Sequence, residues 1–216
     1  MPMFLEFIDI LADEIKLGLP GWEAQRRMIS GRPKMDLDAV AKKNPRQSAV
    51  LVWLYPENDE IFTRLILRTA YKGVHSAQVA FPGGTKEEFD TTLWQTALRE
   101  AHEEVGVLQE HIRYVGELSP VYIPPSNFWV QPYIGMSEKK MPAIIQETEV
   151  QKAFDVNLLQ LIDPKIKEEK LIMHSDSETG INTPYYNIEG HTVWGATAMM
   201  LSELEELLRR VYKRMV

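Results

Sequence analysis

Residues 99–107 read REAHEEVGV, a short acidic segment from which the architecture of the chain can be worked out. On a helix that turns ~100° per residue, Glu100, Glu103 and Glu104 lie within an arc of roughly 100°. Ala101 lies on a different, apolar face that suits packing against a sheet. The segment therefore predicts an amphipathic helix that carries three carboxylates along one polar stripe.

Carboxylates on one stripe repel each other, because like charges four residues apart destabilise a helix. From Asp90 to His111 the only Lys or Arg residue is Arg99. A hard divalent cation such as Mg²⁺ or Mn²⁺ relieves the repulsion, since it takes oxygen ligands and keeps positions open for substrate phosphates. The alternative interpretation is a solvated acidic helix face.

Glycines flank the acidic segment and favour the metal site. Gly83 and Gly84 stand before it, and Gly106 follows where a left-handed glycine ends a helix. With average residue usage, an arginine, three glutamates and a glycine at fixed positions arise by chance with a probability on the order of one in a thousand for a chain of this size.

Hydrophobic periodicity places further elements on both sides of this helix, which we expect over 91–105. Apolar runs predict a strand at 49–55 and its hairpin partner at 61–68. Helices are expected at 3–17, 22–29 and 196–214, and strands at 112–118, 128–136, 152–156, 170–174, 185–188 and 191–194. Strands and helices mix without strict alternation, which indicates an α/β or α+β fold with one mixed sheet between helices.

Composition limits the partners of the chain. It has 216 residues, of which 44% are hydrophobic, as in an ordinary soluble globular domain. The net charge of −7 disfavours nucleic acids and anionic membranes as partners. No Cys is present, which excludes disulfides, thiolate metal sites and cysteine nucleophiles. Residues 1–16 carry acidic residues through the apolar part and no basic start, so we expect a cytoplasmic protein without an export signal.

Gly84, then Asp90, then residues 99–107 resemble the Nudix box, a loop–helix–loop that binds divalent metals in hydrolases of nucleoside-diphosphate-linked compounds. Asp90 stands where the general box has Glu, and the spacing from Gly84 to Arg99 is one residue longer. Both departures are familiar in the coenzyme A pyrophosphatase branch. The resemblance implies an α/β/α sandwich and a single domain over 1–216, with an N-terminal helical extension at 1–35 and the core at 48–216.

A second motif lies directly before the box. Residues 67–70 (LRTA) and 75–84 (HSAQVAFPGG) resemble the coenzyme A signature of the same branch. Gly73 stands where an Arg is common, and Ala77 where a Gly is usual. Segments in 19–25, 126–132 and 194–198 are also similar to the branch.

The resemblance implies a role for each candidate residue. Glu100, Glu103 and Glu104, with the Gly84 carbonyl, are expected to bind Mg²⁺ or Mn²⁺. Glu103 and Glu104 are also candidates for acting on the attacking water, and Arg99 for orienting the carboxylates. Glu147 and Glu149 are alternatives for the general base, although a plain helix-cap or surface role suits them better. Substrate contacts are expected from Arg68, His75, Gln78, Phe81, Ser126 and Phe128.

The leading hypothesis is metal-dependent hydrolysis of coenzyme A, or a derivative of it, to 4′-phosphopantetheine and adenosine 3′,5′-bisphosphate. One alternative is a Nudix hydrolase of another small nucleotide substrate, such as ADP-ribose, a dinucleotide or a nucleoside triphosphate. Another is a nucleotide-binding module without turnover, against which the complete set of carboxylates argues. The apolar N-terminal helix also allows a homodimer.

Overall fold

Strand β1 (Arg46–Glu57) is the centre of the main sheet. It pairs antiparallel with β2 (Glu60–Arg68) and parallel with β7 (Phe128–Met136). Further strands of this sheet are β3 (Val79–Ala80), β4 (Gly83–Thr85), β5 (Arg113–Glu117), β6 (Val121–Ile123) and β8 (Val150–Asn157). The sheet is therefore mixed, as the sequence predicts. The computed structural model describes residues 2–31, 34, 36–69, 78–172 and 180–216.

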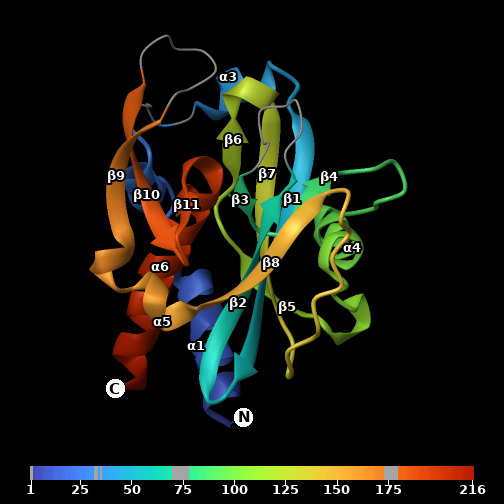
Figure 1. Ribbon diagram of the computed structural model, residues 1–216, viewed down its shortest axis with the longest axis vertical. Coiled ribbons are helices and arrows are strands. Elements are labelled where there is room, and N and C mark those ends of the chain that lie inside the picture. The colour runs from blue at the N-terminus through green and yellow to red at the C-terminus, as the bar shows by residue number, and fades with distance from the viewer. Residues whose placement is uncertain (1, 32–33, 35, 70–77, 173–179) are drawn as a thin grey trace.

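Long helices cover both faces of this sheet (Figure 1). In β1, Val52 and Leu54 pack with α1 (Pro2–Leu17) and α6 (Gly195–Met215) in one hydrophobic core. Leu51 and Trp53 face the other way and pack with α4 (Leu93–Val105) in a second core. The alternating side chains of one buried strand thus join two layers of helices, which confirms the predicted fold class.

A smaller sheet lies beside α6. Its antiparallel strands are β9 (Lys167–Ile172), β10 (Ile181–Ile188) and β11 (His191–Val193). Shorter helices are α2 (Trp22–Gln25), α3 (Leu37–Ala41), α5 (Leu158–Leu161), η1 (Arg26–Met28), η2 (Gln109–His111), η3 (Pro124–Ser126) and η4 (Pro164–Ile166). Where the chain is described, none of its helices has both the length and the apolar character that crossing a membrane requires.

The predicted elements around the acidic helix are confirmed, and three short strands, β3, β4 and β6, were missed. The segment 119–127, which lies between the predicted strands 112–118 and 128–136, contains β6 and η3. Gly83 and Gly84, for which no strand was predicted, belong to β4, which pairs with β1. Such strands are too short for the alternation of side chains to show in the sequence. They matter because β4 and β6 border the site described next.

Candidate active site

Helix α4 begins and ends with the caps that its sequence requires. The Thr92 hydroxyl accepts a hydrogen bond from the backbone N–H of Gln95. Gly106 ends the helix with φ 74° in the left-handed region. Between these ends the three predicted carboxylates differ in environment: Glu104 is buried, Glu100 is largely buried, and Glu103 is exposed.

The two glycines of β4 allow α4 to approach the sheet closely. Gly83 has φ 156°, and a Cβ atom there would lie 2.3 Å from the carbonyl oxygen of Ala49. A Cβ atom on Gly84 would lie 2.4 Å from the carboxylate of Glu100. The carboxylate of Glu100 therefore packs directly on the backbone of Gly84, and only glycine leaves room for it.

Arg99 holds the acidic residues of this region together. Its Nε and Nη2 atoms donate to the two carboxylate oxygens of Asp90, at 3.1 and 2.9 Å. Its Nη1 atom donates to Glu100 at 2.9 Å and to Glu103 at 3.0 Å. Hydrogen bonds from Arg99 lower the pKa of Asp90 to about 2. Arg99 thus orients two of the predicted metal ligands, and Asp90 fixes the guanidinium that does so.

Glu104 is held from the opposite side. The N–H of Gly83 donates to Glu104 Oε2 at 2.8 Å, and Arg68 Nη1 donates to Glu104 Oε1 at 2.8 Å. Burial raises the pKa of Glu104 to about 7, although Arg68 and the Gly83 N–H favour the ionised form. Glu100 and Glu149 add to the rise by repulsion.

Burial also raises the pKa of Glu100 against the attraction of Arg99, and the charges of Glu103 and Glu149 contribute to the rise. Four carboxylates thus influence one another at this end of α4. Glu149, which directly precedes β8, lies 4.0 Å from Arg68 Nη2 and is half-exposed. The structure thus places Glu149 near the α4 carboxylates, which could not be told from its position in the sequence.

The donors at this site suit a hard divalent cation. They are carboxylate oxygens that repel each other, and Arg99 Nη1 bridges Glu100 and Glu103 where a cation is expected. The described residues hold no ready-made group of three or more acidic or histidine metal ligands. The Gly84 carbonyl, also predicted as a ligand, accepts a hydrogen bond from Ser48 Oγ at 2.6 Å and keeps a second lone pair.

A cavity of about 740 Å³ opens beside this cluster. Its polar end includes Ser48, Arg68 and Gly84, and its apolar end includes Phe81 and Met200. Among the predicted substrate residues, Arg68, Gln78, Phe81 and Phe128 line it. Ser126 lies in η3 and is not among the described lining residues, and His75 falls outside the residues that the structure describes.

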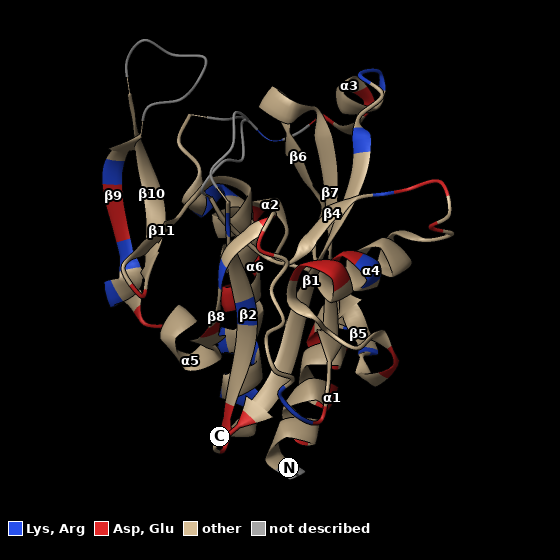
Figure 2. Ribbon diagram, turned by 45° about the vertical axis from the view of Figure 1, so that its right-hand side comes forward, with Lys and Arg blue, Asp and Glu red and all other residues tan. Residues whose placement is uncertain are grey.

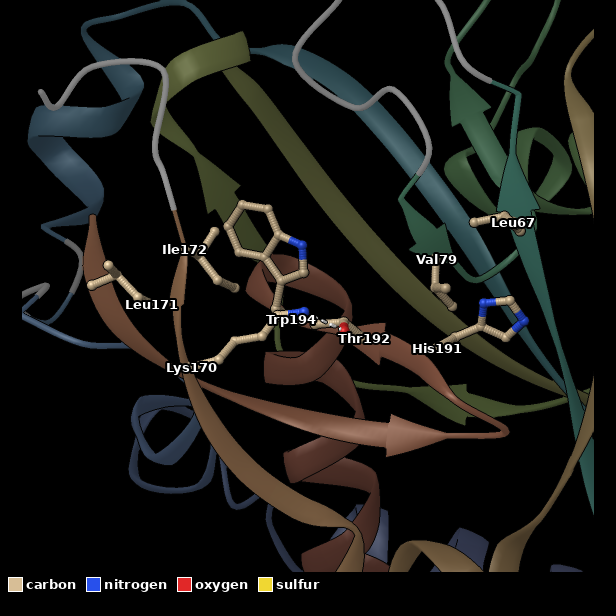
Figure 3. A pocket seen from close by; sticks show the side chains of 8 residues that line it. All are labelled: Leu67, Val79, Lys170, Leu171, Ile172, His191, Thr192 and Trp194. Atoms are coloured by element: carbon tan, nitrogen blue, oxygen red, sulfur yellow. Dashed lines mark hydrogen bonds between the residues drawn. The ribbon is translucent and has the colours of Figure 1, made fainter. Parts of the chain in front are cut away.

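A second cavity of about 350 Å³ lies between β3 and the smaller sheet (Figure 3). Lys170 and His191 border it, together with apolar side chains and Trp194. Unlike the larger cavity, it is not lined by Arg68, Gly83 or Gly84, the residues that contact the α4 carboxylates Glu104 and Glu100. Val79 and Trp194 line both cavities, which are therefore neighbours.

Some cavity residues were not assigned from the sequence. Arg46 and Ser48 come from the start of β1, and the run Trp194–Thr197 comes from the start of α6. The sequence did indicate the second of these segments, because 194–198 resembles the coenzyme A branch. Arg46 follows Lys42 and Lys43, a basic cluster that composition alone does not connect with the acidic helix.

The sequence and this geometry can be compared with known proteins. A model of the NUDIX domain matches residues 45–174, more than half of the chain. The chain belongs to the Nudix family. It is similar to the uncharacterized Nudix hydrolase NudL of an Enterobacter species, strain 638, with 32% identity over 173 residues, 80% of this chain and 86% of the relative. NudL of Salmonella typhimurium, strain LT2, is 31% identical over 175 residues, with the same shares covered.

Solved structures with this fold include a MutT/nudix family protein from Enterococcus faecalis, at TM-score 0.49 and 17% identity over 83% of this chain and 71% of that one. A C. elegans Ap4A hydrolase complex matches at TM-score 0.48 and 17% identity over 79% and 97%. The match to the NUDIX domain and the similarity to NudL make the chain a Nudix hydrolase, a class that generally uses divalent ions such as Mg²⁺ or Mn²⁺. The relatives' names give no substrate, so the coenzyme A assignment and the residue roles stay predictions.

Proposed function

We propose that this Nudix hydrolase cleaves the pyrophosphate bond of coenzyme A or of its derivatives. The observation that carries the proposal is the cavity of about 740 Å³. It is lined by Arg68, Gly83 and Gly84, which contact carboxylates of α4, and at its apolar end by Phe81, Met199 and Met200. A pyrophosphate bound at the polar end leaves the apolar end for a long, uncharged arm. The neighbouring cavity beyond Trp194 extends that path.

The sequence supports the same substrate. The segments at 67–70 and 75–84, which resemble the coenzyme A signature, contribute Arg68, Gln78 and Phe81 to the cavity wall. ADP-ribose and dinucleotides lack a long, uncharged arm of this kind, so they leave the apolar end of the cavity without a matching group.

In the proposed reaction, a water oxygen forms a bond to one phosphorus and the bridging P–O bond breaks. The products are 4′-phosphopantetheine and adenosine 3′,5′-bisphosphate, and the water proton passes to a base. A bound Mg²⁺ or Mn²⁺ supplies charge neutralisation on the phosphate oxygens and a lower pKa for a coordinated water. Glu100, Glu103 and Glu104 are the side chains proposed to hold it, with the Gly84 carbonyl.

The remaining polar groups act on water and on the carboxylates. Glu149 is our choice for the base, because its carboxylate is half-exposed and lies beside Arg68 without a short ion pair. Arg99 positions Glu100 and Glu103, and Arg68 positions Glu104. We further propose that the chain works as one unit, since α6 from its C-terminal part completes the cavity wall.

Product analysis tests the proposal. Purified protein with Mg²⁺ or Mn²⁺ is incubated separately with coenzyme A, ADP-ribose, NADH and a nucleoside triphosphate, and the products are identified by mass spectrometry. We expect adenosine 3′,5′-bisphosphate from coenzyme A as the main product. Preferred cleavage of another substrate contradicts the coenzyme A assignment and leaves the Nudix chemistry. No cleavage of any substrate, with metal bound, favours a binding module instead.

Glu149→Gln separates the base from the metal ligands. If Glu149 takes the water proton, the variant lowers kcat by about 10²–10⁴-fold while the metal affinity stays close to that of the wild type. Glu110→Gln is the matched control, because Glu110 is an exposed carboxylate in η2, whereas Glu149 lies 4.0 Å from Arg68 Nη2. An unchanged kcat in Glu149→Gln contradicts the assignment.

A further inference from the structure

The two cations on the wall of the larger cavity differ in whether a carboxylate balances their charge. Its described lining contains two charged residues, Arg46 and Arg68, and both are cations. The charge of Arg68 is balanced by Glu104 at 2.8 Å and by Glu149 at 4.0 Å. Arg46, in contrast, forms no ion pair with any residue that the structure describes; its polar side-chain contact is Thr85 Oγ1 at 3.5 Å.

Arg46 is held in place by an aromatic ring. Its guanidinium carbon lies 4.4 Å from the centre of the Phe128 ring, its partner across the parallel β1–β7 pair. Lys43 lies in the same way over Tyr122, with Nζ 5.5 Å from the ring centre. Both rings line the cavity. Cation–π contacts of this kind orient the cations and leave their charge uncompensated.

Asn127 joins these two cation–aromatic pairs. Its side chain accepts a hydrogen bond from the Tyr122 hydroxyl at 3.0 Å and donates to the Lys43 carbonyl at 3.1 Å. Its own carbonyl accepts from the Arg46 N–H at 2.9 Å. Figure 2 shows basic residues at the start of β1, at the end of the molecule where β6 and β7 meet. Asn127 therefore connects Lys43 and Arg46, with their aromatic partners, in one hydrogen-bonded cluster at the cavity.

This cluster around Lys43 and Arg46 lies close in the structure to the proposed metal ligands. Thr85, which Arg46 contacts, follows Gly84, on which the Glu100 carboxylate packs. In a protein with a net charge of −7, a cation without a carboxylate partner at a cavity wall favours an anionic ligand. The aromatic rings beside it suit a nucleotide base.

We propose that Arg46, assisted by Lys43, binds a phosphate group that the substrate carries on its ribose in addition to the pyrophosphate. The inference rests on the proposed function, because coenzyme A carries such a group at the ribose 3′ position. It assigns the nucleotide end of the substrate to the wall formed by β1, β6 and β7, and the uncharged arm to the end beside Met199 and Met200.

Binding in the absence of metal tests this separately from turnover. The affinities of adenosine 3′,5′-bisphosphate and AMP are measured by calorimetry in EDTA for wild type, Arg46→Gln, Arg46→Lys and Lys43→Gln. We expect wild type to bind the bisphosphate about tenfold or more tightly than AMP, as a charge-assisted hydrogen bond allows. Arg46→Gln abolishes this ratio, and Arg46→Lys and Lys43→Gln reduce it.

The matched control is Arg113→Gln, because Arg113 is also an exposed arginine on the main sheet but lies outside the described cavity lining. It keeps the wild-type ratio. The proposal is overturned if wild type binds both ligands equally, or if Arg46→Gln keeps the ratio while its melting temperature shows a folded protein.

Kinetics distinguish the two proposals. If coenzyme A is cleaved, Arg46→Gln lowers the preference in kcat/KM for coenzyme A over its 3′-dephospho form by about tenfold. If coenzyme A is cleaved and the preference is unchanged, the Arg46 assignment fails and the proposed function stands. If coenzyme A is not cleaved but the binding ratio depends on Arg46, the proposed function fails and the phosphate site stands.

Discussion

Two glutamates in this molecule are buried to nearly the same degree and have opposite surroundings. Glu203, on α6, is 0% exposed and accepts hydrogen bonds from the backbone N–H groups of Gly21 and Ser119, the Gln25 amide and the Ser119 hydroxyl, at 2.7–3.1 Å. Glu104, on α4, is 1% exposed and accepts one bond from Gly83 and one from Arg68.

The number of donors decides what each carboxylate does. Four donors satisfy Glu203, and through them it ties the N-terminal segment and the β5–β6 loop to α6. Glu104 has fewer donors, and burial raises its pKa to about 7, with smaller contributions from the charges of Glu100 and Glu149. A buried carboxylate that lacks full compensation, and whose partners Arg68 and Gly83 line a cavity, indicates a place for a further cation.

The same substitution at both positions gives the sharpest test of this difference. Glu104→Gln removes a proposed metal ligand, so we expect kcat to fall about 100-fold or more while the protein stays folded. Glu203→Gln leaves kcat of the folded protein unchanged. Steady-state kinetics with Mg²⁺, alongside circular dichroism, check both. Near-normal turnover in Glu104→Gln would contradict the proposal that Glu104 binds the metal.

For stability we expect the larger effect from Glu203→Gln rather than from Glu104→Gln. In Glu203→Gln an amide NH₂ replaces an acceptor and faces N–H donors, which costs about 3 kcal/mol of unfolding free energy. For a chain of this size that corresponds to a melting temperature lower by roughly 6–12 °C. Thermal unfolding measures the shift, with Glu206→Gln on the same helix as the control, because Glu206 makes an exposed contact with Arg27. Equal changes in melting temperature in the two variants would contradict the structural role of Glu203 in joining the N-terminal segment and the β5–β6 loop to α6.

Metal binding extends the comparison to the wild-type protein. A ligand that binds the native state stabilises it by about 2.7 kcal/mol at 100 times its dissociation constant. Mg²⁺ or Mn²⁺ should therefore raise the melting temperature of wild type and of Glu203→Gln by the same few degrees, and that of Glu104→Gln less. An equal rise in all three proteins places the bound metal away from Glu104.

The sequence predicted the layers of the fold and the acidic helix, because both depend on local patterns. Gly106 was expected to end α4 in the left-handed region, and it does. The partner of Glu104 was not predictable in this way. Within 90–111 the only Lys or Arg residue is Arg99, whereas Arg68 reaches Glu104 from β2, 36 residues earlier in the chain.

Other parts of the site depend on the same kind of long-range contact. Glu203 and Gln25 are 178 residues apart in the chain, and the cavity takes its apolar end from α6. Periodicity identified α6 as a helix, but it does not tell which of its residues face a ligand. The sequence likewise placed Asp90 in the box without indicating that Arg99 would bind both of its carboxylate oxygens.

Asp90 is a third case in the comparison, a buried carboxylate whose donors include a cation. Besides Arg99, it accepts hydrogen bonds from the Glu87 N–H and the Thr96 hydroxyl. Because its pKa is lowered from 3.8 to about 2 in the folded state, its contribution to stability is present above pH ~4 and is lost as the pH falls towards 2. Asp90→Asn should remove this dependence.

Urea unfolding between pH 5 and 2.5 measures that dependence. We expect wild type to lose on the order of 1–2 kcal/mol more stability over this range than Asp90→Asn. Glu87→Gln is the control, because Glu87 contacts Asp90 through its backbone N–H rather than its side chain. Parallel curves for wild type and Asp90→Asn would show that the Arg99 pair adds no net stability to the ionised carboxylate. The hydrogen bonds at Asp90 would then serve only to hold Arg99 in position for Glu100 and Glu103.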